Sequence, residues 1–174
     1  MPSFSLNGLA KSTDQVYIGL DPGRSGGLAI LHGESVYLHA LSISTHDLWE
    51  LVEAIPLGSG RFAMLEIVNS RPDQSAVSTF SFGQTYGQQE MALVASSIPY
   101  RKVTPKEWQR GVNIGGKTLG EKQTVWKNRL RAHAQKLFPG VKITLATADA
   151  LLMAEYCRRF RTGQVPTKTD AGRV

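Results

Sequence analysis

The sequence predicts an α/β protein in which one five-stranded mixed sheet carries helices on both faces. Short runs rich in β-branched and aromatic residues alternate with longer segments whose apolar residues recur at helical spacing. Their expected order is three strands, a helix, a strand, a helix, a strand and a final group of helices, which favours a sheet layered with helices. With 174 residues, 41% of them hydrophobic, the chain is long enough to bury the core of one domain.

The first three strands are expected over residues 16–21, 26–31 and 35–41, where the composition is typical of β-structure. Short turn signals, GRSG and HGE, separate them. Because connections this short join antiparallel neighbours, the three strands should form a meander. A helix over residues 46–55 follows, with Thr45 as its expected N-cap.

The second half of the chain alternates strands with helices. Residues 61–68 predict the fourth strand, and residues 98–103 the fifth. TPKEW is typical of a helix start, with Thr104 as the cap and Pro105 in the first turn. Three further helices are expected over residues 75–96, 121–137 and 147–161, and the glycine-rich loop NIGGKTLGEK precedes the second of them.

One folded domain is expected over residues 15–162, after a flexible leader (1–14) and before a disordered tail (163–174). The single cysteine, Cys157, has no partner for an internal disulfide. The first residues lack the pattern of a signal peptide, and no apolar run is long enough to span a bilayer. We therefore expect an intracellular protein, cytoplasmic or nucleoid-associated or phage-encoded in a host cytoplasm. It should be neither secreted nor bound to a membrane.

Positive charge is concentrated in one part of the chain. The net charge is +6, yet residues 1–100 hold only 4 Lys or Arg against 9 Asp or Glu. Residues 101–143 hold 11 Lys or Arg against 2 Asp or Glu. Such a concentration favours a surface that binds a polyanion such as nucleic acid, although a solvated helix face would have the same composition.

Three carboxylates occur in sequence that otherwise predicts burial. Asp21 ends the first strand, Glu66 lies at the end of the fourth, and Asp149 lies in the first turn of the last helix. Buried acids are normally paired or bound to a metal, and grouped oxygen ligands suit Mg²⁺ or Mn²⁺. Each has a simpler alternative: Asp21 could cap a turn, Glu66 could pair with an Arg, and Asp149 could favour a helix N-terminus. Spacing alone does not show that the three meet.

The chain resembles the RuvC-type Holliday junction resolvases of the RNase H-like superfamily, especially their organellar and phage-like branch. The resemblance starts at YIGLDPGRSGGLAIL and continues through LEIVNSRPDQSAVSTFSFGQTYG, KVTPKEWQR, KLFP and ADALLMAEYCRR. It implies an RNase H-like fold and a homodimer that binds four-way DNA junctions and resolves them by paired symmetric nicks. It also implies that Asp21, Glu66 and Asp149 are catalytic ligands of Mg²⁺ or Mn²⁺, with two ions in each active site.

Two positions depart from this family pattern. The family places a fourth acidic or histidine ligand one helical turn before the last aspartate, where this chain has Ala146. Either three carboxylates suffice, or another residue such as Thr144 or Thr147 contributes, or the chain is weakened or inactive. Some relatives also carry an aromatic wedge three residues after the glutamate, where this chain has Asn69. The nearby Phe80 and Phe82 are expected in the core.

The DNA-binding surface is expected on the glycine-rich loop and the basic helix that follows it. Ammonium and guanidinium groups there would contact phosphates without reading sequence. Trp108 and Trp126 lie among these charges and are expected to pack in the core. The candidate DNA-binding residues are Arg24, Lys117, Lys122, Lys127, Arg129 and Arg131.

Three competing functions remain open from the sequence. An actin-like phosphotransferase also opens on an apolar strand, an aspartate and a glycine turn, but it needs a second phosphate loop that this chain lacks. We therefore expect no nucleotide cofactor. A junction-binding protein with weak or no catalysis is supported by Ala146. Another RNase H-like nuclease, acting on other nucleic acids, is the third possibility.

Overall fold

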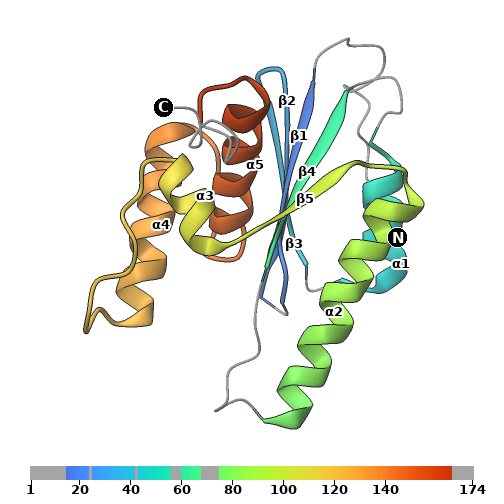
Figure 1. Cartoon of the computed structure of the whole chain (residues 1–174), viewed down its shortest axis with the longest axis horizontal. Helices are drawn as coiled ribbons and strands as arrows, with labels where there is room; N and C mark the ends of the chain where they lie inside the picture. The colour runs from blue at the N-terminus through green and yellow to red at the C-terminus, as the bar shows by residue number, and fades with distance from the viewer. Residues whose placement is uncertain (1–14, 24, 42, 56–59, 68–74, 166–174) are drawn as a thin grey trace, which may run out of the picture.

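A five-stranded mixed sheet forms the centre of the molecule in the order β3-β2-β1-β4-β5 (Figure 1). The computed structural model describes residues 15–23, 25–41, 43–55, 60–67 and 75–165. Strands β1, β2 and β3 pair antiparallel, whereas β1 with β4 and β4 with β5 pair parallel. The predicted fold class and the predicted meander are confirmed. The strands are β1 (Val16–Asp21), β2 (Gly27–His32), β3 (Ser35–Ala40), β4 (Arg61–Glu66) and β5 (Tyr100–Val103).

Helices cover both faces of the sheet, α1 and α2 on one and α3, α4 and α5 on the other (Figure 1). Strand β1 contributes side chains to the apolar cores on both faces of the sheet, because successive side chains of a strand point to opposite faces. Ile18 and Leu20 pack in the apolar cluster with α1, whereas Tyr17 packs against the cluster that contains α5. The helices are α1 (Thr45–Glu53), α2 (Ala76–Ala95), α3 (Pro105–Gly111), α4 (Gln123–Leu137) and α5 (Ala148–Arg161).

Helix starts follow from side chains that cap free backbone N–H groups. Thr104 caps α3 as predicted, because its hydroxyl accepts a hydrogen bond from the Glu107 backbone N–H. The prediction of Thr45 as the cap of α1 is wrong by one residue. Ser44 has the extended backbone that a cap needs and exchanges hydrogen bonds with Asp47, whereas Thr45 is already helical.

Helix α5 lies against β1 at a glycine. A Cβ atom on Gly19 would lie 2.1 Å from the backbone oxygen of Ala150 and 2.5 Å from the backbone nitrogen of Ala154. Only a residue without a side chain permits this approach of helix to strand. The approach sets the first turn of α5 beside the end of β1.

The predicted leader and residues 166–174 of the predicted tail lie outside the described residues. Within the described part of the chain, no helix has both the length and the apolar character that crossing a membrane requires.

Candidate functional site

The three predicted carboxylates come together at one edge of the sheet. Strands β1 and β4 are parallel neighbours, so their last residues, Asp21 and Glu66, lie at the same edge. Asp149 reaches this edge from the first turn of α5, which packs on β1. All three are buried, with exposed fractions of 8%, 8% and 5% respectively. The alternative that each acid serves a separate local purpose is therefore not what the structure shows.

Burial and mutual repulsion make this cluster costly to ionise. Burial raises the pKa of Asp21 well above its ordinary value, and the charges of Asp149 and Glu66 raise it further. Burial also raises the pKa of Glu66, although a hydrogen bond from Trp108 opposes that rise. The carboxyl groups of Asp21 and Glu66 share a hydrogen bond that favours the proton on Asp21. A cation at this edge would relieve the repulsion.

Lys127 of α4 supplies part of that positive charge. Its Nζ atom lies 2.5 Å from Oδ2 of Asp149. Burial acts to lower the pKa of Lys127, but the charges of Asp149, Asp21 and Glu66 outweigh burial and raise it. The other oxygen of Asp149, Oδ1, is buried and has no hydrogen-bond partner among the described residues. One ammonium group therefore only partly satisfies the cluster.

Trp108 holds the glutamate of the cluster, a role that the sequence analysis did not anticipate. Its indole Nε1–H donates a hydrogen bond of 2.8 Å to Oε1 of Glu66. The side chain is 1% exposed, so it also packs in the core as predicted. The available signal was a tryptophan in the short helix that directly follows the fifth strand, because a buried indole N–H needs an acceptor.

The cluster fits a divalent cation in donor type and charge. Carboxylate oxygens are the ligands that Mg²⁺ and Mn²⁺ prefer, and within the described part of the chain Oδ1 of Asp149 has no partner. Glu66, Asp149 and Lys127 also line a cavity of about 730 Å³, which gives access to the site. Across the described residues, however, no three His, Cys, Asp or Glu side chains are grouped tightly enough to hold a metal ion as they stand. Ligation would therefore require the carboxylates to close together.

Comparison with known proteins is informative only at the level of structure. No protein-family model matches the sequence, and no curated protein matches it either. Thermus thermophilus RuvC in complex with a Holliday junction substrate aligns with a TM-score of 0.54 over 88% of this chain and 98% of that chain, at 14% identity. A second Thermus thermophilus RuvC structure aligns with a TM-score of 0.54 over 86% and 97%, at 16% identity. The chain has the RuvC fold.

Within this RuvC fold, the two hydroxyl groups suggested as replacements near position 146 hydrogen-bond to each other. Thr144 and Thr147 bond to each other, because Oγ1 of Thr147 accepts from the Thr144 backbone N–H and lies 3.1 Å from Oγ1 of Thr144. Among the described residues, the acids that interact with Asp21 are Glu66 and Asp149. The additional charged side chain that interacts with the three carboxylates is the cationic Lys127 rather than a fourth acid.

The predicted DNA-binding residues divide into two groups. Lys117 lines the carboxylate cavity, and its Nζ atom donates to the neutral amide of Gln123 and to no other side chain among the described residues. Lys122, the residue just before α4, and Arg131 on α4 are both exposed. Phosphate binding by these three residues stays a prediction, and Arg24 lies outside the described residues.

Two other predicted DNA-binding residues are engaged within the protein. Lys127 is paired with Asp149 in the carboxylate cluster. Arg129 donates to the backbone oxygen of Gly116 and to Oε2 of Glu121, and its guanidinium lies over the Trp126 ring. These contacts show Arg129 holding the glycine-rich loop on α4.

The expected core position of Phe80 is wrong, because 75% of its side chain is exposed on α2. Phe82 is half-buried and packs against Tyr86. The two aromatic residues are two positions apart on a helix and therefore cannot share one face, which the sequence analysis overlooked. Asn69, where relatives carry a wedge, lies outside the described residues.

Proposed function

We propose that this chain is a divalent-metal-dependent endonuclease that binds four-way DNA junctions as a homodimer and resolves them by paired symmetric nicks. The observation that carries the proposal is the cluster of Asp21, Glu66 and Asp149 at one edge of a sheet with the RuvC fold. Support comes from a structural neighbour that is a RuvC bound to a Holliday junction substrate. The basic segment of this chain lies next to the cluster, since Lys117 lines the same cavity.

The roles of the residues follow from their positions. Bound Mg²⁺ or Mn²⁺, one or two ions, would activate water and stabilise negative charge on the phosphate. Asp21 and Glu66, on rigid strand ends, would hold the metal together with Asp149. Trp108 fixes Oε1 of Glu66, so that carboxylate has one orientation. Lys127 would have to give up Oδ2 of Asp149 for this carboxylate to hold a metal with both oxygens.

A gel assay with labelled junctions tests the function. We expect nicks at symmetric positions in Mg²⁺ or Mn²⁺, none in Ca²⁺, and much slower cleavage of a linear duplex and of an RNA–DNA hybrid. Equal cleavage of all three substrates would replace the proposal with a general RNase H-like nuclease.

A second candidate is a junction-binding protein with weak or no catalysis. Two observations favour it: position 146 carries Ala, and Lys127 already neutralises Asp149. Tight junction binding in Ca²⁺ without any nicks in Mg²⁺ or Mn²⁺ would establish this candidate in place of the enzyme.

The Ala146→Asp variant tests how much an acid at position 146 would strengthen metal binding. Residue 146 lies in the turn just before α5, three positions ahead of Asp149, so an aspartate there would add a carboxylate next to the start of this helix. We expect Mn²⁺ to bind about tenfold more tightly by calorimetry, a change of about 1.4 kcal/mol. Nicking should then begin at lower metal concentration.

Leu145→Asp is the control for this variant, because it adds the same charge at an exposed neighbouring position. Equal gains from both variants would mean that general electrostatic attraction, not ligation, is responsible. No gain from Ala146→Asp would show that three carboxylates already suffice.

Helix α2 supports the proposed homodimer, because one face of it is mostly apolar and is exposed in the single chain. Every residue of this face is exposed, and the spacing alternates between three and four as in helices that pair with each other. Gly87 lies on this face and would allow two helices to approach closely. Two copies related by a twofold axis would cover it and would present two active sites to a junction. The face, called here the α2 face, consists of Val77, Phe80, Gln84, Gly87, Met91 and Val94.

The double variant Phe80→Asp/Met91→Asp is expected to be monomeric. The two side chains are 75% and 59% exposed in the single chain, so their replacement removes apolar contacts between copies without disturbing the core. Size-exclusion chromatography with light scattering gives the mass directly, and junction affinity should fall at least about tenfold because one of two linked binding surfaces is lost. Trp49→Asp, at an exposed apolar position on α1, should leave the mass unchanged. A dimer that survives the double variant would place the interface elsewhere.

A further inference from the structure

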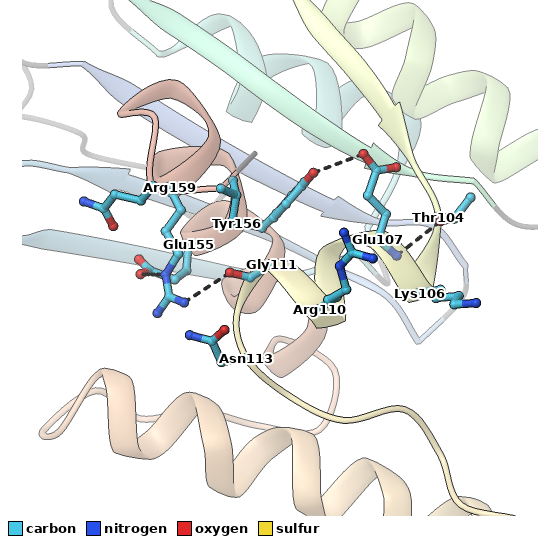
Figure 2. A pocket seen from close by; sticks show the side chains of 11 residues that line it. Thr104, Lys106, Glu107, Arg110, Gly111, Asn113, Glu155, Tyr156 and Arg159 are labelled. Atoms are coloured by element: carbon cyan, nitrogen blue, oxygen red, sulfur yellow. Dashed lines mark hydrogen bonds and ion pairs between the residues drawn. The ribbon is translucent and has the colours of Figure 1, made fainter. Parts of the chain in front are cut away.

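Helix α3 separates two cavities, and two cationic side chains lie on the ridge between them. The first cavity, of about 730 Å³, contains Glu66 and Asp149. The second, of about 770 Å³, lies beside α5 and contains Glu155 (Figure 2). Lys106 and Arg110 line both cavities. They are four residues apart on α3 and therefore lie on one side of the helix.

The other charged groups of the second cavity are already paired. Glu107 accepts hydrogen bonds from Arg101 and from the Tyr156 hydroxyl, at 2.6 and 3.1 Å. Arg159 donates to Glu155 and to the backbone oxygen of Gly111, and Figure 2 shows this last contact as a dashed line. The acids of this cavity are thus neutralised within the protein and do not repel an anion.

Lys106 and Arg110 differ from these residues. Both are exposed, and no ion pair or hydrogen bond joins either side chain to another residue in the described ranges. In the first cavity Lys117 is likewise bonded only to the neutral Gln123. Three cations without a carboxylate partner therefore border the cavity in which Glu66 and Asp149 lie.

We propose that Lys106 and Arg110 hold the backbone phosphates of the cleaved DNA strand next to the phosphate that reaches the carboxylates. The strand would run across α3, from the carboxylate cavity into the second cavity. This inference rests on the proposed function. The ligand is a DNA strand, because a row of cations without carboxylate partners, leading to an acidic cluster, matches the regular spacing of charge on a chain of phosphates. These contacts fix the position of the strand and read no bases.

The test is the double variant Lys106→Ala/Arg110→Ala, studied as the full chain with a labelled four-way junction in Ca²⁺. Fluorescence anisotropy over a salt series should show affinity at least about tenfold weaker. The slope of log affinity against log salt should become shallower by about two, because each lost phosphate contact releases about one counterion fewer. Lys106→Gln/Arg110→Gln should reproduce both effects while it keeps long polar side chains.

The matched control is Lys136→Ala/Lys142→Ala, which removes the same charge at exposed positions that line neither cavity. Its salt slope should stay within about one of the unmodified slope. Unchanged affinity and slope in the α3 variants, with junction binding intact in the unmodified chain, would overturn this inference alone. Failure of the unmodified chain to bind a junction would overturn the proposed function together with it.

Discussion

Asp21→Asn is expected to reduce junction nicking at least about 100-fold, because an amide cannot replace the carboxylate at the centre of the cluster. Removal of a residue that only supports a metal ligand typically costs 10- to 100-fold, so loss of a ligand should cost no less. Junction affinity in Ca²⁺ should stay within about threefold, since the basic groups that contact phosphate are unchanged. The measurement is single-turnover nicking beside anisotropy on the same junction.

The same variant should be more stable than the unmodified chain at neutral pH. The folded-state pKa of Asp21 lies well above its ordinary value of 3.8, so above about pH 4 the unfolded chain ionises first. The free energy of unfolding then falls as the pH rises from about 4 to the raised pKa of the folded state. Asn cannot ionise, so the variant does not lose this stability. Thermal melts should show a gain for the variant at pH 7 and almost none at pH 3.

Glu34→Gln is the control, because Glu34 is an exposed acid in the turn between β2 and β3. It should change neither nicking nor the pH dependence of melting. An Asp21→Asn protein that nicks at the unmodified rate would remove the cluster from the mechanism and with it the proposed function.

Gly19→Ala is expected to lower the free energy of unfolding by about 3 kcal/mol or more. The new methyl group would meet backbone atoms of α5 at Ala150 and Ala154, which cannot rotate away as a side chain would. Helix α5 must then move off β1, and Asp149 moves with it. We therefore expect urea denaturation at lower concentration, together with a loss of nicking in the protein that remains folded.

Gly83→Ala is the matched control, because it adds the same methyl group in a helix. Nothing lies within 4 Å of that position, and Gly83 is outside the α2 face. It should raise the free energy of unfolding by about 0.5–1 kcal/mol through better helix propensity. Equal unfolding midpoints for Gly19→Ala and the unmodified chain would show that α5 does not pack on β1 as described.

The end of β1 was predictable in detail because its signals are local. Alternating or continuous apolar runs define a strand, and a lone carboxylate at its end, followed by glycines, is visible in VYIGLDPGRSGG. Boundaries were less accurate. Thr45 and Ser44 are both good caps, and only the backbone conformation of the folded chain distinguishes them.

The partners of the carboxylates were not predictable, although the carboxylates themselves were. Trp108 bonds to Glu66 across 42 positions, and Lys127 pairs with Asp149 across 22. Lys127 was expected to bind phosphate, because in the sequence it is one of many basic residues on an amphipathic helix. Its pairing depends on how α4 packs beside α5.

The sequence by itself determined the fold class, the succession of strands and helices, and the positions of three acids at the ends of these elements. Hydrophobic periodicity and the ends of elements depend on neighbouring residues, so they can be recognised without the fold. Only the tertiary structure decided that Lys127 and Arg129 form ion pairs inside the protein, whereas Lys106 and Arg110 have no acidic partner among the residues that the structure describes. The physical reason is that charge pairing acts over a few ångströms in space, and the packing of helices on the sheet sets those distances.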